Sequence, residues 1–342
     1  MSLILRQALA RNSAEKRIMQ GQWDELTAMR QNSLKDVEQL IHMTGNVARS
    51  PAEAYREFDQ TTKIEQVPAG EFATLTRLLQ VSRPVSIGRE VFEYRQASDA
   101  GRGQTSMSGQ IGVKLDHVDY KYAGTVIPVH DIGFGRRWRE VESMRAEGFD
   151  ALVDDSREAE RELIRTIDNY LWDGDANIVF KGNSWLGIKN DPTVANETLG
   201  VDLSAAASTA HDIRNEVKRV RDVLYITNNC TKMLRLGVSR EIMSNWENEF
   251  TVNDVGFGTI LDFVKKLRGI EEIYEDSRLV GNQLTLAYMA QDGFHPVTGM
   301  GLSTYAVPRL YHNSDFNFIK WAAIGFLSRN DYSGRTCALY AD

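Results

Sequence analysis

Gly-x-Gly triplets are candidate phosphate-binding loops, because glycine lets a backbone approach a phosphate group closely. They occur at residues 133–135, 256–258 and 299–301. None has the third glycine and the strand-to-helix setting of a dinucleotide-binding loop, and the sequence contains no G-x-x-x-x-G-K-[ST] phosphate-binding motif. We therefore expect no bound cofactor.

Histidines are the next residues to weigh, since they act as metal ligands and as general bases. The chain has six: His42, His117, His130, His211, His295 and His312. None lies four residues from another, which is the spacing that places two metal ligands on one face of a helix. The sequence therefore predicts no metal site.

Ser-Gly pairs and adjacent acidic residues are candidate nucleophiles and acid–base groups. The Ser-Gly pairs at 108–109 and 333–334 lack the G-x-S-x-G pattern that exposes a nucleophile, and turn formation explains them. The adjacent acids at 154–155 and 271–272 point to different faces of their elements and have arginines nearby, as solvated surfaces do. We expect no catalytic residue in this chain.

The two cysteines, Cys230 and Cys337, have no C-x-x-C spacing and no nearby pair of histidines. We expect neither a disulfide framework nor a zinc site from them, and interpret both as buried, unreactive thiols. The net charge of −7 excludes a dedicated nucleic-acid binder, which needs a concentrated basic surface. Any contact of this protein with DNA should be limited and weak.

The composition is that of a folded protein. Of 342 residues, 42% are hydrophobic and 25% are charged, with 7 prolines and 26 glycines, which allows two modest domains or one elongated subunit. No stretch approaches the roughly 18 apolar residues needed to span a bilayer, and residues 1–19 lack the apolar block of a signal peptide. We expect the protein to stay in the cytoplasm where it is made.

The first element along the chain is a helical arm from Leu3 to about His42, with breaks at Gly21 and Gly45. Its apolar residues repeat at helical spacing on a polar background: Leu34, Val37, Leu40 and Ile41. Such a narrow stripe is marginal alone in water, so the arm should pack against other parts of its subunit or a neighbour. A loosely attached helical hairpin on the same subunit is the alternative.

A long β-hairpin is expected between Pro84 and Pro128. Apolar and polar residues alternate on both sides of a stretch rich in Gly, Ser and Gln, residues 97–112, which would form the tip. A hairpin this long cannot bury both of its faces, which implies that something else covers it. The alternative is a hairpin that stays solvated on its own subunit.

A stiff helix should follow, from about Trp138 to Trp172 unless Gly148 interrupts it. Beyond Asn177 the pattern indicates a compact α/β unit with a helix at 211–221, a strand at 223–227, helices at 231–236 and 259–267, and a strand at 284–289. The final stretch, residues 301–340, is typical of several strands, because its aromatic residues lie near two-residue spacing.

The sequence after the stiff helix resembles a known family. Asp173-Gly174-Asp175 is followed by Gly182, Trp185-Leu186-Gly187-Ile188-Lys189-Asn190 and Pro192. Many capsid proteins of tailed phages and prophages carry a similar G-D … G-(I/L)-x-N-x-P run. The end of the chain, from Ala306-Val307-Pro308 to Arg335-Thr336-Cys337-Ala338-Leu339-Tyr340-Ala341-Asp342, is similar to the strand-rich closing segment of the same family. The family has the fold named after phage Hong Kong ninety-seven, which encapsulins share.

The resemblance implies an α+β phage capsid fold. Its expected parts are an amino-terminal arm (1–68), a long E-loop hairpin with its lead-in (69–128), a P-domain with a long spine helix (129–200), a compact α/β A-domain (201–285), returning antiparallel P-domain strands (286–329) and a closing A-domain segment (330–342). It implies inter-subunit contacts at the E-loop tip, at Asp99, Gly101, Arg102 and Gly103. Gly174, Gly187, Ile188, Asn190 and Pro192 are the expected structural motif.

The implied function is a major capsid protein that is not an enzyme. It would assemble with itself into pentamers and hexamers of an icosahedral virion shell in the bacterial host cytoplasm, with portal, scaffold and decoration proteins as partners. Packaged double-stranded DNA would be met only by non-specific contact, and no membrane is involved. The hairpin tip contains no lysine, so we expect a shell without the lysine-to-asparagine cross-links of some family members.

Two other interpretations remain open. An encapsulin-like compartment would share the fold and enclose cargo enzymes instead of DNA. A two-domain enzyme with an unrecognised site belongs to a different class of function.

Overall fold

The computed structural model divides into two units, Met1–Ile64 and Glu65–Asp342. It describes residues 20–21, 24–25, 27–28 and 31 of the first unit, and residues 66–101, 103, 105, 107, 117–147, 151–252 and 255–342 of the second. The described residues of the first unit are helical, including Gly21, so the expected break at Gly21 is wrong. Glycine costs a helix only about 1 kcal/mol, which its neighbours can offset. The rest of the expected arm lies outside the described residues.

A five-stranded sheet forms one core of the second unit. Its strand order is β5 (Ala195–Glu197), β13 (Ala338–Ala341), β10 (Leu284–Ala287), β6 (Leu234–Val238) and β9 (Ile270–Glu275). The central strand β10 is antiparallel to both of its neighbours, and the two outer pairs are parallel. Residues 338–341 therefore form an inner strand of this sheet, between β5 and β10.

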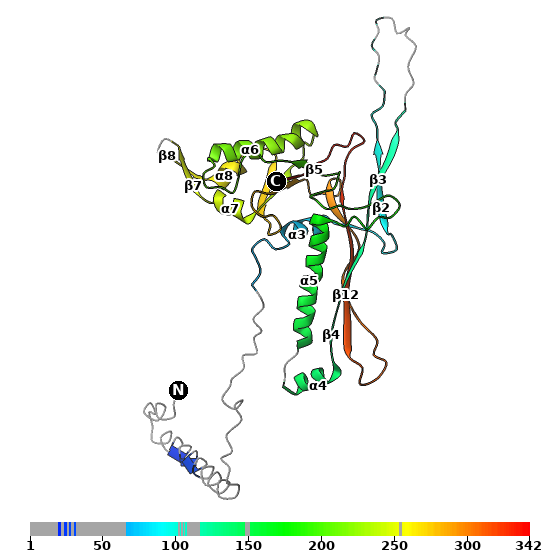
Figure 1. Ribbon diagram of the computed structural model, residues 1–342, viewed down its shortest axis with the longest axis vertical. Coiled ribbons are helices and arrows are strands. Elements are labelled where there is room, and N and C mark those ends of the chain that lie inside the picture. The colour runs from blue at the N-terminus through cyan, green and yellow to red at the C-terminus, as the bar shows by residue number, and fades with distance from the viewer. Residues whose placement is uncertain are drawn as a thin grey trace. The chain divides into compact units, whose positions relative to one another are not determined.

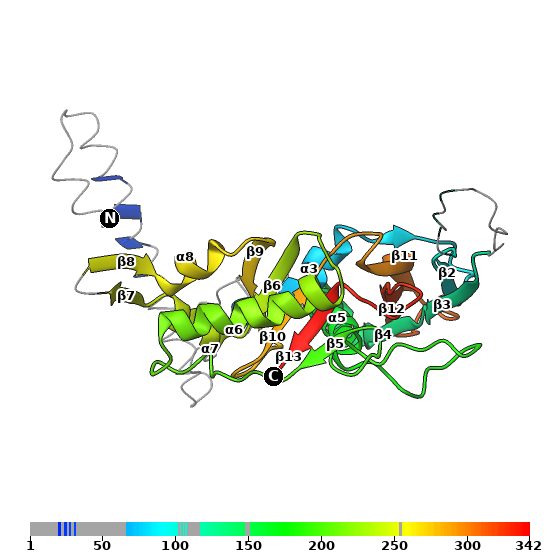
Figure 2. The same cartoon turned by 90° about the horizontal axis from the view of Figure 1, so that it is seen from above.

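Helices cover this sheet: α6 (Ala210–Asp222), α7 (Arg240–Trp246) and α8 (Ile260–Lys265). Figure 2 shows α6 lying across the strands. Each helix begins at a hydroxyl residue, Thr209, Ser239 or Thr259, whose side-chain oxygen accepts a hydrogen bond from a backbone N–H of the first turn. These N-caps fix where each helix starts.

Two expected elements of this α/β part are wrong. The apolar run Val223–Thr227 is a π-helical continuation of α6, labelled η2, because Leu224 extends the buried face of Val217 and Val220 at helical spacing. The expected helix at 231–236 is instead the start of strand β6, which pairs with both β10 and β9. The expected helices at 211–221 and 259–267 and the strand at 284–289 correspond to α6, α8 and β10.

A four-stranded sheet forms the second core, in the order β1 (Arg83–Pro84), β11 (Phe294–Ala306), β12 (Phe316–Ser328) and β4 (Val129–Arg136). The long helix α5 (Ala151–Asp173) packs along β4 and β12. The expected single rod from Trp138 is described as two helices, α4 (Trp138–Glu147) and α5, with residues 148–150 outside the described part. Figure 1 shows α5 running beside the strands.

The short helix α3 (Ala73–Leu79) leads into a hairpin of β2 (Val91–Ala97) and β3 (Tyr120–Val126). The two strands are antiparallel in a register that runs from Val91 opposite Val126 to Ala97 opposite Tyr120, as expected for a hairpin. A second hairpin joins β7 (Glu249–Val252) and β8 (Val255–Thr259). Among the described residues, no helix is both long and apolar enough to cross a membrane.

Cys230 and Cys337 form a disulfide, so their interpretation as free thiols is wrong. Their α-carbons lie 5.6 Å apart although 107 residues separate them in sequence. The fold brings them together because Cys230 follows η2 and Cys337 precedes β13. Sequence spacing carries no signal of such a long-range contact.

Candidate functional site

Gly174 and Gly187 bring two backbone segments into direct contact. Gly174 ends α5 with a φ of +64°, and a β-carbon built there would lie 2.3 Å from the carbonyl carbon of Leu186. Gly187 has a φ of +84°, and its β-carbon would lie 2.3 Å from the carbonyl oxygen of Trp172. Both positions therefore require glycine for conformation and for space. The motif thus joins the end of the helix to the loop that follows.

That loop caps the carboxyl end of α5. The backbone N–H of Ile188 donates to the carbonyl of Leu171 at 3.0 Å. The indole N–H of Trp185 lies 3.1 Å from the carbonyl oxygen of Tyr170, and both Trp185 and Ile188 are buried. The last carbonyls of a helix have no partner within it, so these donors satisfy groups that burial would otherwise leave unpaired.

The remaining motif residues face solvent. Asn190 and Pro192 are exposed, while Asp191 between them is buried and accepts hydrogen bonds from the backbone N–H groups of Leu186 and Thr193. Asp191 therefore holds the turn, a role that the sequence pattern did not assign to it. The structure brings Gly174, Gly187 and Ile188 together, and leaves Asn190 and Pro192 available for contacts outside the subunit.

Charged groups lie buried where α5 meets the segment after β9. Asp168 is only 1% exposed, and neither of its oxygens has a hydrogen-bond partner. The closest cation is Arg278, whose Nε lies 3.7 Å from an Asp168 oxygen. Burial, and then the carboxylate of buried Asp276, raise the pKa of Asp168 to about 7. Helix α5 therefore carries a buried carboxyl group without a hydrogen-bond partner.

The base of the β2–β3 hairpin is clamped to a distant segment. The hydroxyl of Tyr94 accepts the backbone N–H of Asn330 at 2.9 Å and donates to the Asn330 side-chain oxygen at 2.5 Å. The Gln96 amide donates to the same side-chain oxygen at 2.7 Å, and the Lys121 ammonium lies 4.1 Å from the centre of the Tyr332 ring. Both strands of the hairpin therefore contact residues 330–332.

The described residues of the hairpin near its expected tip are exposed to solvent. Of the expected tip residues, Asp99, Gly101 and Gly103 are exposed, and Arg102 lies outside the described residues. On β3, the side chains of Tyr120 and Tyr122 are 56% and 70% exposed. Large aromatic side chains this open to solvent are typical of interaction surfaces.

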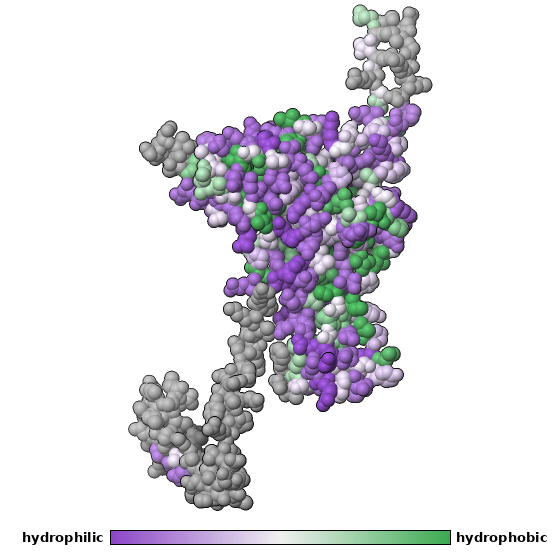
Figure 3. Space-filling view, viewed as in Figure 1, coloured by the Kyte–Doolittle hydropathy of each residue, from purple (hydrophilic) through white to green (hydrophobic). Residues whose placement is uncertain are grey.

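A further exposed apolar region belongs to the long strands β11 and β12. Tyr305 pairs across strands with Ile319, and both are exposed, as are Leu310 and Tyr311 in the connection between the strands. Figure 3 shows hydrophobic residues on the face where Figure 1 places β12 and β4. In the part of the chain that the structure describes, no group of three or more His, Cys, Asp or Glu residues is arranged to hold a metal ion.

Residues 43–341 match the model of one protein family, whose description reads "Family of unknown function (DUF6260)". The chain belongs to this family. No curated protein matches this DUF6260 chain.

Solved structures place the fold of this DUF6260 chain among phage capsids. The capsid of Myoviridae Phage XM1 superposes with a TM-score of 0.64 at 10% identity, over 86% of this chain and 99% of that chain. Microbacterium phage Oxtober96 gives 0.59 at 12% identity, over 87% and 100%. The capsid of the native GTA particle gives 0.55 at 12% identity, over 85% and 96%. The expected α+β, Hong Kong ninety-seven-type capsid fold is confirmed.

Proposed function

We propose that this chain is the major capsid protein of a tailed bacteriophage, which assembles with itself into an icosahedral shell around double-stranded DNA. The observation that carries the proposal is the fold match with the capsid of phage XM1, which covers 99% of that chain. The match also covers 86% of this chain, so it extends over most of the subunit. The greater part of the fold is therefore shared with the subunit of a capsid.

The surface of the second unit supports self-assembly on physical grounds. The hairpin leaves Tyr120 and Tyr122 open to solvent, and the strands β11 and β12 leave Tyr305 and Ile319 open. Covering such side chains with a neighbouring subunit contributes about 25 cal/mol for each Å² of apolar area removed from water. Weak contacts of this kind, repeated around closed symmetry, give a cooperative assembly.

The finer assignments belong to the same proposal. Asp99, Gly101, Arg102 and Gly103 would contact a neighbouring subunit. Residues 129–200 and 286–329 would form the P-domain, and residues 201–285 and 330–342 the A-domain that converges in pentamers and hexamers. Assembly would take place in the host cytoplasm with portal, scaffold and decoration proteins. DNA contact would be non-specific, in keeping with the net charge of −7.

Negative-stain microscopy of the overexpressed protein tests the proposal, and closed shells of uniform size are the expected result. Replacing residues 98–119 by an Asn-Gly turn should leave the subunit folded and abolish shells, because the hairpin can no longer reach a neighbour. A loop of the original length made of Gly and Ser is the matched control, since it separates reach from side-chain contacts.

A protein that stays monomeric at high concentration would contradict self-assembly. Particles taken from the natural host and treated with nuclease should still contain genome-length DNA. If they enclose a cargo protein instead, the encapsulin-like alternative holds and the phage shell does not.

A further inference from the structure

The two cysteines of the disulfide differ in their exposure to solvent. Cys230 is 3% exposed, whereas Cys337 is partly exposed and lines an open pocket of about 410 Å³ beside the hairpin base. The pocket is also lined by Asn228, Arg95, Arg329 and Arg335. A small molecule in this pocket can therefore approach Cys337, whereas Cys230 is buried and does not line the pocket.

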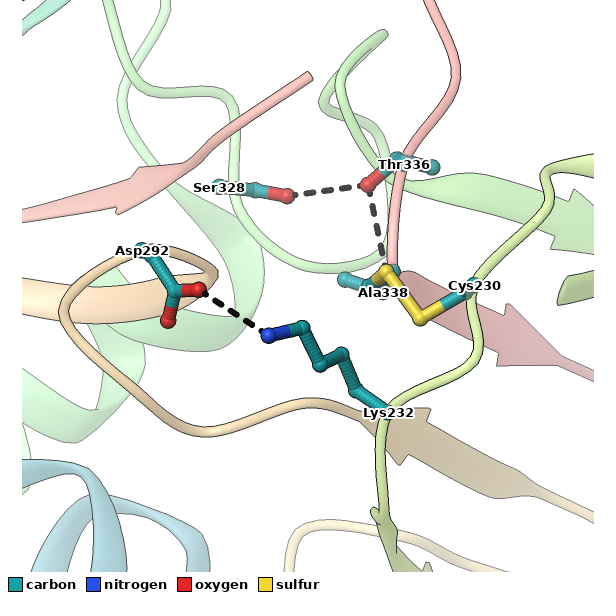
Figure 4. Close-up of a disulfide and its surroundings, with 7 residues drawn as sticks. Cys230, Lys232, Asp292, Ser328, Thr336 and Ala338 are labelled. Carbon is teal, nitrogen blue, oxygen red and sulfur yellow. Dashed lines mark hydrogen bonds and ion pairs between the residues drawn. A yellow bond between two sulfur atoms is a disulfide. The ribbon is translucent and has the colours of Figure 1, made fainter. Parts of the chain in front are cut away.

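The pocket favours an anionic oxidant. Three arginines and two aspartates line it. Asp292 is paired with Lys232, whose ammonium lies 3.6 Å away, and Asp331 is occupied by the backbone N–H groups of Ser333 and Arg335. Figure 4 shows the Lys232–Asp292 pair beside the disulfide. Positive side chains near a cysteine favour its thiolate, which is the reactive form.

The disulfide is connected to the hairpin by a short path. Thr336, which precedes Cys337, forms a β-bridge with Asn330, and its hydroxyl lies 3.2 Å from that of Ser328 (Figure 4). Asn330 in turn holds Tyr94 and Gln96 of β2. Fixing Cys337 therefore fixes the segment to which the hairpin base is bonded.

We propose that the Cys230–Cys337 bond is a late oxidative latch, closed by a small-molecule disulfide that reacts first at Cys337, and that its closure immobilises the base of the β2–β3 hairpin. The timing rests on the proposed function: a shell assembled in a bacterial cytoplasm is built from reduced subunits, because that compartment keeps thiols reduced. Release from the cell exposes the shell to oxidising surroundings.

The reaction is thiol–disulfide exchange in two steps. The Cys337 thiolate attacks one sulfur of a small disulfide RS–SR, forming a Cys337–SR mixed disulfide and releasing RS⁻. The Cys230 thiolate then attacks the Cys337 sulfur, forming the Cys230–Cys337 bond and releasing the second RS⁻. The protein loses two protons and two electrons, and the small disulfide is reduced to two thiols.

Mass spectrometry of the full chain tests the timing. Cells that overexpress the protein are lysed into a denaturant that contains N-ethylmaleimide, so that the buried Cys230 is also accessible, and both cysteines should be labelled. Shells reduced and then incubated with oxidised glutathione should take up no label. Protein that is already disulfide-bonded at lysis overturns the late closure, and protein that stays reduced with oxidised glutathione overturns the latch.

Single variants test the order of reaction. Cys230→Ser incubated with oxidised glutathione should accumulate a mixed disulfide at Cys337. The matched variant Cys337→Ser should form its mixed disulfide at least about tenfold more slowly, because the remaining thiol is buried. Equal rates for the two variants would overturn entry at Cys337.

Hydrogen exchange tests the effect on the hairpin without any mutation. Closing the bond in wild-type shells should slow amide exchange in 91–97 and 120–126 at least about threefold relative to reduced shells. The Cys230→Ser/Cys337→Ser double variant is the control and should show no response to oxidised glutathione. Unchanged exchange in the wild type would show that the bond does not act on the hairpin.

Shell formation separates this proposal from the proposed function. The double variant should form shells of wild-type size. If it forms none while the wild type does, the bond is needed for assembly and cannot be late. If the wild type forms none, the shell function fails, while the order of thiol reaction is still measured by the two single variants.

Discussion

Gly174 and Gly187 touch so closely that the end of α5 and the following loop behave as one backbone unit. The space between them is filled by main-chain atoms, which cannot rotate away as a flexible side chain can. Gly182 offers a useful contrast in the same loop. It also has a positive φ, of +79°, but a β-carbon added there would meet nothing within 4 Å.

We expect Gly187→Ala to destabilise the protein more than Gly182→Ala. Both changes place a β-carbon at positive φ, which costs roughly 1–2 kcal/mol. Only Gly187→Ala adds a clash with Trp172, and overpacking of this kind costs about 1–3 kcal/mol more. Thermal unfolding of both variants measures the difference. Equal melting temperatures would contradict the close approach.

At the scale of elements, helix α5 buries the Asp168 carboxyl group, and ionising this group lowers the stability of the folded state. The charged groups that influence the Asp168 carboxyl are Asp276, Arg278, Asp173 and Glu71, of which only Arg278 favours its ionised form. The pKa of Asp168 in the folded protein, about 7, is raised above its ordinary value of 3.8. The folded state therefore keeps a proton that the unfolded chain loses between about pH 4 and pH 7. Stability must fall as the pH rises through this window.

We expect Asp168→Asn to flatten this pH dependence. The cost of ionising Asp168 amounts to about 4–5 kcal/mol above pH 7, at 1.4 kcal/mol per pKa unit. The variant should be more stable than wild type at pH 8 and similar at pH 4, where both side chains are neutral. Arg278 keeps Asp173 as a partner at 2.5 Å, so no cation is left unpaired.

Chemical denaturation from pH 4 to pH 8 measures the effect of Asp168→Asn. Asp99→Asn, at an exposed residue of the hairpin, is the control and should follow the wild-type curve. A variant that is less stable than wild type at pH 8 would contradict a raised pKa as the source of the cost.

The sequence predicted best those elements that follow from the spacing of apolar residues within one short segment. The hairpin strands, α6, α8 and β10 follow from alternation or helical spacing alone. Val223–Thr227 was mistaken for a strand because its β-branched residues fit one, whereas in the fold these residues continue α6 and Leu224 extends its buried face. The disulfide, the contact of Gly174 with Gly187 and the clamp on Asn330 depend on tertiary proximity. No spacing rule contains that information.

At the scale of the whole molecule, the second unit has two larger sheets and a hairpin on which Tyr120 and Tyr122 are open to solvent. The expected hairpin tip, residues 97–112, has no lysine, and the next lysines along the sequence are Lys114 and Lys121. Lys121 lies over the ring of Tyr332 in its own subunit. We therefore expect the proposed shell to be held by non-covalent contacts.

Denaturing electrophoresis of purified particles under reducing conditions should therefore show a single band of monomer. The Cys230–Cys337 bond lies within one chain and adds no multimer. A ladder of higher bands that survives reduction would reveal cross-links between subunits and refute this expectation.

Strand β13 has a consequence for synthesis. It is the second strand of its sheet, between β5 and β10, yet it is made of residues 338–341. Until residues 338–341 have been translated, β10 lacks one of its two partners and Leu339 is missing from the core. A ribosome that stops early thus releases a chain with an open sheet, and such a chain cannot supply a sound subunit to a growing lattice.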